Sequence, residues 1–362
     1  MEPLPKRTSL VDETARVLKD WINTGRLNGE LPGELQLKQR LGVGRDTLRR
    51  ALRLLTEERW LRPSNQGRAR SVEAQRLPAH TAATRHLPVT FLSPYPVVQR
   101  LTILEMEETR VRLAEQGRAL HFISPGIYDL KNPQHHLERL AREHPSAAWV
   151  LHIASEPIQR WFDERGLPTL LFDNPFPGVH LPFVADDWEA AAFHAGVQLA
   201  RHGHRIVASL EYEERRPGLL AMERGLQRAL APANPPGRVV VFKDKLAAPT
   251  VAHSLELAFG RKERPTALVL SRAPQLLTCY SWLASRGIRV PGEVSLVALA
   301  DESWFAEIHP PVSHYRADPR RKGRHIAERV LELVAAGHAS KKSIRLPREY
   351  VPGATIGPAP RA

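Results

Sequence analysis

Arginine side chains recur at four-residue intervals in the segment 45–53, and such an arrangement can bind a polyanion. The positions are Arg45, Arg49 and Arg53, with Arg50 beside the second of them. On a helix this spacing puts the guanidinium groups in one row. The other face is apolar, with Leu48, Ala51, Leu52 and Leu55. Because a planar guanidinium matches the O6 and N7 acceptors of guanine, the row predicts contacts with nucleic acid. The alternative is a solvated charged face without a partner.

The arginine row lies on the second helix of a predicted helix-turn-helix. Leu37 and Leu41, four residues apart, indicate a short helix before it. The sequence Gly42-Val43-Gly44 ends that helix, because glycine tolerates the positive φ of a tight turn. Residues 9–24 have the apolar spacing of an amphipathic helix and would complete a three-helix core.

A β-hairpin is predicted after the second helix. Trp60-Leu61 is typical of a short strand, residues 63–67 of a turn, and residues 68–72 of a returning strand. Arg68 and Arg70 fall on one side of the returning strand. From there they can reach phosphates or a narrow minor groove.

The segment 31–72 resembles the winged helix-turn-helix of GntR-type bacterial repressors. The matching residues are Leu31-Pro32, Glu34, Leu37, Leu41-Gly42-Val43, Arg45, Thr47, Arg49, Ala51-Leu52 and Gly67. The resemblance implies that Arg45 and Arg49 contact DNA, that Thr47 assists them, and that Gly67 lies at the tip of the wing. With the basic residues of the helix and the wing, the predicted DNA-binding residues are Arg45, Asp46, Thr47, Arg49, Arg50, Gly67, Arg68 and Arg70.

Four positions depart from the GntR pattern. The usual serine before Glu34 is Gly33, the usual arginine after it is Leu35, the serine that usually caps the recognition helix is Gly44, and the second wing glycine is Ala69. Leu35 removes one expected DNA contact. The preferred operator is therefore expected to differ from the common type.

The composition indicates a cytoplasmic protein with a polyanionic partner. Residues 1–87 hold 17 Lys and Arg against 10 Asp and Glu, so the net charge of +13 is concentrated at the N-terminal end. The single cysteine, Cys279, lies in an apolar run and predicts a buried core residue rather than a nucleophile or a disulfide. No secretion signal or stretch of eighteen apolar residues occurs, so we expect no membrane association.

From residue 88 onward, strands and helices alternate. Strands are predicted at 89–92, 119–123, 148–153, 169–172, 205–210, 239–242, 266–270 and 294–299, with helices at 97–116, 133–143, 156–165, 187–202, 217–230, 249–259, 274–286 and 320–336. Such alternation predicts an α/β fold of parallel sheets flanked by helices. There are more strand–helix units than a single sheet usually contains, and this favours two lobes.

The region 88–352 resembles the sensor domain of LacI-type repressors, which is related to periplasmic sugar-binding proteins. The resemblance rests on the order of short motifs, among them Leu171-Phe172-Asp173, Val184-Ala185-Asp186-Asp187, His202-Gly203-His204-Arg205-Ile206 and Val294-Ser295-Leu296-Val297-Ala298. A GntR-type head on a LacI-type sensor is the architecture of arabinose-repressor-like regulators. The predicted organisation is a winged helix-turn-helix at 1–72, a linker at 73–87, a two-lobed ligand-sensing and dimerisation domain at 88–355, and a tail at 356–362.

Ligands of open α/β lobes bind at the carboxyl ends of the strands. The candidate ligand-binding residues are Ser93, Tyr95, Asp173, Asp186, Arg216, Arg272, Asp301, Trp304 and Arg316. Several groups of the family's sugar sites are replaced: Met222 stands for an arginine, Ala300 for an aspartate, and Ser271-Arg272 for an Asn-Asp pair. A pocket that contains Arg216, Arg272 and Arg316 favours an anion over a neutral sugar. The alternative is that these arginines form salt bridges with Asp173, Asp186 or Glu302, and that the aromatic residues only pack within a lobe.

The sequence therefore predicts a bacterial transcriptional regulator, a repressor, that binds an approximately palindromic operator in double-stranded DNA as a homodimer. A sugar or an anionic sugar derivative in the cleft between the lobes would control the DNA affinity. No catalytic motif is present, neither of the close histidine pairs has favourable metal spacing, and no cofactor is expected. Two alternatives stay open: a regulator whose sensor has lost its ligand and serves dimerisation, and a solute-binding protein with a basic N-terminus.

Overall fold

The computed structural model describes residues 9–23, 27, 31–58, 60–62, 87–94, 100–214, 216–245, 247–336 and 342–361. The chain forms two compact units: Met1–His86 with Ala335–Gly337, and Leu87–Val334 with His338–Ala362. Over the described residues, no helix is long and apolar enough to cross a membrane.

The described residues of the first unit form three helices, as the apolar spacing predicted. They are α1 (Leu10–Asn23), α2 (Glu34–Leu41) and α3 (Arg45–Glu57). Leu18, Leu37 and Leu48 are almost completely buried in their shared core. Gly42 ends α2 in the left-handed conformation with φ of 64°, and its N–H donates to the carbonyl of Lys38, which confirms the predicted turn. The tip and returning strand of the predicted wing, 63–72, lie outside the described residues, as does most of the linker.

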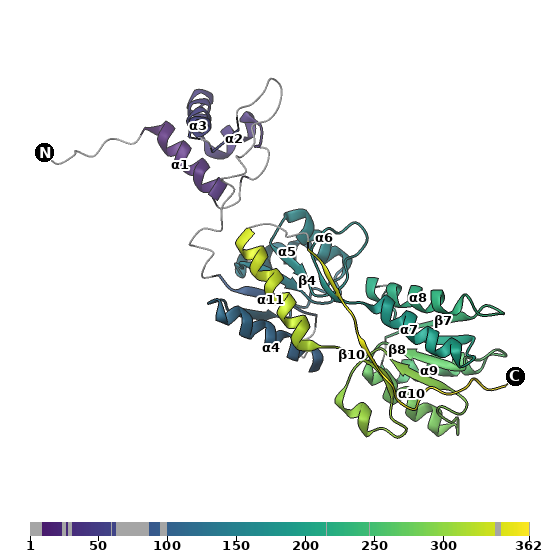
Figure 1. Cartoon of the computed structure of the whole chain (residues 1–362). Helices are drawn as coiled ribbons and strands as arrows, with labels where there is room; N and C mark the ends of the chain where they lie inside the picture. Colours follow the sequence, from purple (N-terminus) through teal and green to yellow (C-terminus); the bar gives the residue numbers. More distant parts are fainter. Residues whose placement is uncertain are drawn as a thin grey trace. The chain divides into compact units, whose positions relative to one another are not determined.

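The second unit begins with a lobe built on a parallel sheet (Figure 1). Its strand order is β2 (Leu120–Ile123), β1 (Val89–Leu92), β3 (Ala148–Leu151) and β4 (Thr169–Leu171). One face packs against α4 (Arg100–Glu115) and α11 (Pro319–Ala336). The other face packs against α5 (Gln134–Glu143) and α6 (Glu156–Arg165). Both faces of β1, β3 and β4 are therefore buried, which explains their continuous apolar runs.

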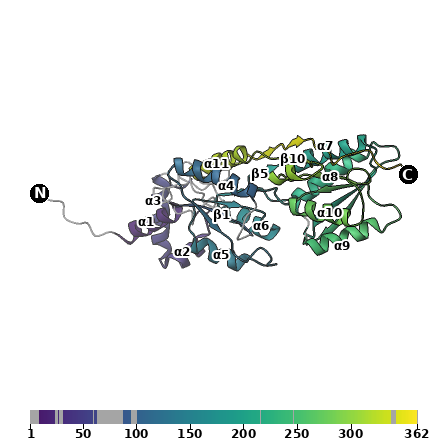
Figure 2. The same ribbon diagram turned by 90° about the horizontal axis from the view of Figure 1, so that it is seen from below.

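The second lobe contains six strands. Their order is β12 (Glu349–Val351), β10 (Ser313–Arg316), β9 (Ser295–Ala298), β8 (Ala267–Leu270), β6 (Ile206–Tyr212) and β7 (Arg238–Asp244). The helices on one face are α7 (Trp188–Arg201) and α8 (Pro217–Leu230), and those on the other are α9 (Ala248–Phe259) and α10 (Ala273–Ser285) (Figures 1 and 2). Cys279 is completely buried on α10, as predicted. The described part of the expected tail lies on this lobe, where the carbonyl of Gly357 is 2.9 Å from His204 Nε2.

Three connections join the two lobes. The chain leaves the first lobe after β5 (Val184–Asp186), returns from β10 into α11, and leaves again between β11 (Ile344–Leu346) and β12. β5 and β11 pair in parallel as a two-stranded ribbon. The short strands β5, β10, β11 and β12 were not predicted. β12 also differs from the expected parallel pattern, since it pairs antiparallel with β10 at the edge of the sheet.

Candidate DNA-binding face and ligand cleft

The exposed face of α3 presents the predicted arginines, and one carboxylate from α2 holds two of them. Glu34 Oε2 accepts a hydrogen bond from Arg49 Nε at 3.0 Å and lies 3.9 Å from Arg45 Nε. The Arg45 and Arg49 side chains remain 68% and 48% exposed, so both keep N–H groups free for a partner. Glu34 was recognised in the sequence only as part of a motif. Its role in orienting the arginines could not be inferred, because it depends on the turn between the two helices.

The remaining predicted DNA-binding residues divide into two groups. Asp46 and Arg50 are exposed on α3, and Thr47 is half-buried in its first turn. Leu35, which stands where the GntR pattern has an arginine, is 69% exposed. The wing residues are outside the part of the chain that the structure describes. They are Gly67, Arg68 and Arg70.

A cleft of about 420 Å³ lies between the two lobes of the second unit. Residues that follow the strands line it, as expected for an open α/β fold. Five of the predicted ligand-binding residues are brought together here: Asp173, Asp186, Arg216, Arg272 and Asp301. The other cleft residues used below were missed by sequence reasoning; they are Arg100, Glu105, His152, Phe172, Trp188, Glu302, Lys322 and Arg348.

Three predicted residues with described positions do not line the cleft. Ser93 is buried behind it, with its hydroxyl 3.0 Å from Nδ1 of His152. Trp304 packs against Phe305 and the core of the second lobe, with 4.7 Å between the ring centroids. Arg316 is exposed on β10. Tyr95 lies outside the described residues.

Four buried charges form a network at the floor of the cleft. Lys322 Nζ lies 2.8 Å from Asp186 Oδ2 and 3.4 Å from Glu105 Oε1, and Arg348 Nε lies 3.4 Å from Asp186 Oδ1. The Lys322 ammonium also lies 4.3 Å from the centre of the Phe172 ring. Asp186 ends β5, Lys322 is on α11, and Arg348 lies between β11 and β12. Each of the three connections between the lobes thus contributes one charge.

Burial and ion pairing shift the pKa values of the two carboxyl groups of this network in opposite directions. Burial would raise the pKa of Asp186, but the charges of Arg348 and Lys322 outweigh it and lower the pKa to about 2. Burial raises the pKa of Glu105 to about 7, against the attraction of Lys322. The charges of Asp186 and Glu105 outweigh burial at Lys322 and raise its pKa. Asp186 and Lys322 are consequently charged at neutral pH, whereas Glu105 is partly protonated there.

The wall from the first lobe combines aromatic rings with one unpaired carboxylate. His152 stacks on Phe91 with 5.5 Å between the ring centroids, and it packs at a tilt against Phe172 at 5.1 Å. Burial, together with the charges of Lys322 and Arg216, lowers the pKa of His152 to about 3, so the ring is neutral. Burial also raises the pKa of Asp173, whose Oδ1 accepts the backbone N–H of Asn174 at 2.7 Å. Among the described residues, Asp173 has no ion pair.

The arginines on the cleft differ in their pairing. Arg216 donates to the carbonyl of Ile153 at 2.6 Å and pairs with Glu214 at 2.6 Å. Arg100 pairs with Glu302 at 3.2 Å. No ion pair to Arg272 occurs within the described ranges. Arg272 is therefore the guanidinium that is left for a ligand. The alternative, in which Arg216 pairs with Asp173, Asp186 or Glu302, is not observed, because Arg216 pairs with Glu214.

Two family models match this chain. One, described as bacterial regulatory proteins of the gntR family, matches residues 10–70, and the other, a periplasmic binding protein-like domain, matches residues 197–356. The arabinose metabolism transcriptional repressor of Geobacillus stearothermophilus is 24% identical over 348 residues, which cover 91% of this chain and 92% of the relative. The repressor PurR of Aliivibrio salmonicida is 22% identical over 226 residues, or 62% of this chain and 68% of PurR.

Solved structures show the same fold for the second unit. A LacI family regulator from Enterococcus faecium with bound ribose has a TM-score of 0.61 at 15% identity, over 75% of this chain and 99% of that one. A LacI-type regulator from Bacillus cereus subsp. cytotoxis has a TM-score of 0.66 at 17% identity, over 74% and 98%.

The fold and the two sites define a transcriptional regulator that joins a DNA-binding domain to a periplasmic-binding-protein-like domain. Residues 10–70 match the gntR-family model, and the second unit has the fold of LacI family regulators, as predicted. Its relatives are transcriptional regulators rather than enzymes. No group of three or more potential metal ligands occurs among the described residues.

Proposed function

We propose that the protein is a repressor that binds a palindromic operator as a homodimer and responds to a hydroxylated organic acid in the cleft. The observation that carries the ligand class is that Asp173 and Arg272 both line the cleft and that neither has an ion pair within the described chain. A carboxylate accepts hydrogen bonds from hydroxyl groups, and a free guanidinium binds an acid group. The ribose bound to the Enterococcus faecium regulator supports the carbohydrate part of this class.

For the DNA-binding domain we propose that Arg45 and Arg49 contact base edges in the major groove, with Asp46, Thr47 and Arg50 beside them. Arg68 and Arg70 would bind the backbone or the minor groove from a wing with Gly67 at its tip. We retain residues 1–72 as the DNA-binding domain, 73–87 as a linker and 88–355 as the ligand-sensing domain. If it binds an operator, the protein acts in the cytoplasm, on the nucleoid, and we retain this location as part of the proposal.

Exposed apolar side chains on the second unit support the homodimer. Ile103 and Val111 on α4 are 49% and 41% exposed, and Phe122 on the edge strand β2 is 52% exposed. A surface of this kind is stabilised when a second copy covers it. Val111→Lys is expected to shift the protein from dimer to monomer in sedimentation experiments. The matched control is Leu257→Lys, which places the same charge at a leucine on α9 that is 52% exposed.

The ligand class is tested by titration calorimetry with galacturonate against galactose, and with glucose 6-phosphate against glucose. We expect the acids to bind more tightly than the neutral sugars, and Arg272→Gln to remove the difference, since it removes the unpaired cation. Asp173→Asn is expected to weaken both kinds of ligand, since the hydroxyl acceptor changes. Equal affinity of acids and neutral sugars in the wild-type protein contradicts the acid site.

A second candidate function has one observation in its favour. Most cleft charges are already neutralised within the protein: Asp186 by Lys322 and Arg348, and Arg100 by Glu302. A sensor domain that serves dimerisation alone would show this internal pairing. In that case no hydroxylated acid or sugar binds, while operator affinity and dimerisation are retained.

A further inference from the structure

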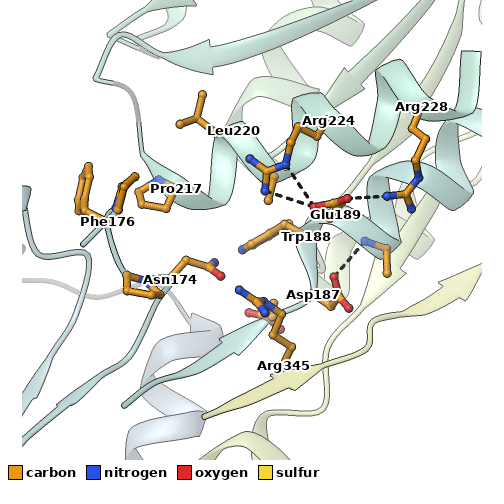
Figure 3. Close-up of a pocket in the computed structure, with 15 residues that line it drawn as sticks. Asn174, Phe176, Asp187, Trp188, Glu189, Pro217, Leu220, Arg224, Arg228 and Arg345 are labelled. Carbon is orange, nitrogen blue, oxygen red and sulfur yellow. Dashed lines mark hydrogen bonds and ion pairs between the residues drawn. The ribbon is translucent and has the colours of Figure 1, made fainter. Parts of the chain in front are cut away.

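A second pocket, of about 590 Å³, lies outside the cleft of the sensor domain (Figure 3). Four segments form it: the loop after β4, the first turn of α7, one face of α8, and β11. It therefore contacts both lobes and one of the connections between them. Asp186 and Trp188 line both this pocket and the cleft.

Three arginines and three carboxylates line the pocket, and the carboxylates are not shared evenly among the arginines. Glu189 Oε2 lies 3.2 Å from Arg224 Nη2, and Glu189 Oε1 lies 2.6 Å from Arg228 Nη1 (Figure 3). Arg345 on β11 stacks over the Phe183 ring at 4.9 Å and has no ion pair over the described residues. Of the other carboxylates, Asp186 is held by Lys322 and Arg348, and Asp187 accepts the N–H of Ala190 as the cap of α7.

This pairing leaves Arg345 without a carboxylate partner among the described residues, together with free donors on Arg224 and Arg228. A guanidinium has five N–H groups, and Glu189 occupies only some of those on Arg224 and Arg228. Because one carboxylate fixes both side chains, the free N–H groups lie in a defined position before any ligand arrives. A group that accepts several hydrogen bonds and carries a negative charge complements this arrangement.

The opposite end of the pocket is apolar. Phe176 and Pro217 lie there, with Leu220 nearby, whereas Arg228 lies at the other end (Figure 3). The wall between them is firmly packed. A Cβ atom added at Gly225 would lie 2.4 Å from the carbonyl oxygen of Glu189, so the glycine is required for α8 to lie this close to α7. The guanidinium of Arg348 covers the Trp188 ring at 4.3 Å.

We propose that this pocket is a second binding site for a small organic anion that carries an apolar ring. The acid group binds Arg345 and Arg224, and the ring lies against Phe176 and Leu220. The site is distinct from the cleft, and its occupant contacts the indole that forms the cleft wall. Binding at the two sites is therefore linked, and any such linkage acts equally in both directions.

The test uses the full-length chain and the fluorescent anion 8-anilinonaphthalene-1-sulfonate. We expect one saturable site with energy transfer from tryptophan. Arg345→Gln is expected to weaken binding about tenfold, the loss that corresponds to one charge-assisted hydrogen bond. Ala221→Phe fills the pocket without changing its charge and is expected to abolish binding. Trp188→Phe is expected to reduce the energy transfer more than the affinity.

Two controls separate this site from general surface binding and from the cleft. Arg289→Gln removes an arginine whose side chain is 81% exposed on another part of the lobe, and it is expected to leave binding unchanged. Arg272→Gln alters only the cleft and should also leave it unchanged. The proposal is overturned if Arg345→Gln binds as the wild type does, or if Arg272→Gln abolishes binding. Because Arg345 is exposed, the Arg345→Gln variant is expected to fold, so it tests the site even if Ala221→Phe does not fold.

Discussion

Replacement of Lys322 by methionine would test the buried charge network that joins the lobe connections. Lys322 lies between Asp186 and Glu105, and the three side chains are 9%, 8% and 3% exposed. The substitution keeps the apolar contact with Phe172 but removes the ammonium. Removing one partner of a buried pair typically costs about 3–5 kcal/mol, because the other charge is left without compensation. We expect the lower end of this range, because Arg348 still pairs with Asp186.

The cost is expected to depend on pH in a defined direction. The pKa of Glu105 is about 7 with Lys322 present, and loss of that cation raises it further. Above pH 7 the wild-type Glu105 is ionised in the folded and unfolded states alike. The folded variant keeps one proton that its unfolded state releases, so its free energy of unfolding falls as the pH rises. The difference from wild type grows by about 1.4 kcal/mol for each pH unit above 7, until the pKa of Glu105 in the variant is reached.

Urea unfolding of the full chain, followed by tryptophan fluorescence at pH 6, 7 and 8, measures both effects. Lys342→Met is the matched control, since Lys342 is exposed. Adding Glu105→Gln to Lys322→Met is expected to remove the pH dependence while a stability deficit remains. A loss below about 1 kcal/mol at all three pH values, within the range of an exposed pair, would refute the reasoning.

Two further predictions concern the DNA-binding face and His152. Arg49→Ala is expected to weaken operator binding by about 1–3 kcal/mol in fluorescence anisotropy, and Glu34→Gln by a smaller amount through loss of orientation; full affinity in both Arg45→Ala and Arg49→Ala would exclude the assigned recognition helix. Because the pKa of folded His152 is lowered to about 3, the unfolded state binds the extra proton below pH 6.5. Protonation of His152 in the unfolded state is expected to lower the free energy of unfolding by about 2 kcal/mol between pH 7 and pH 5. His152→Phe should lose that much less than the wild type, whereas a surface control, His121→Gln, should follow the wild type.

Most of the fold could be predicted because its elements have local signals. The predicted helix at 217–230 coincides with α8, and the predicted strand at 89–92 with β1. In both cases apolar periodicity or a buried apolar run coincides with turn residues at the ends. β5 and β11 have only three residues each, and they are stabilised by each other across about 160 positions of sequence. Such pairing has no local pattern, and for this reason these strands were missed.

Some residues of the cleft could be located from the sequence, whereas others could not. Asp173 and Arg272 directly follow strands β4 and β8, so the rule for open α/β folds located them. Lys322 and Arg348 follow no strand of the cleft edge; they enter through the connections between the lobes. In the sequence, Lys322 stands among the basic residues Arg320, Arg321 and Arg324, and nothing local distinguishes it from them.

The position of the charge network connects the cleft to the movement that regulation requires. A ligand can shift the lobes only as far as it binds one arrangement better than another. Asp186, Lys322 and Arg348 lie on the segments that connect the lobes, and they also line the cleft. An acid group that approaches Lys322 competes with Asp186 and Glu105 for the same ammonium. A ligand in the cleft would therefore directly weaken the ion pairs that hold the lobe connections together. No further side chains would be needed to transmit its effect.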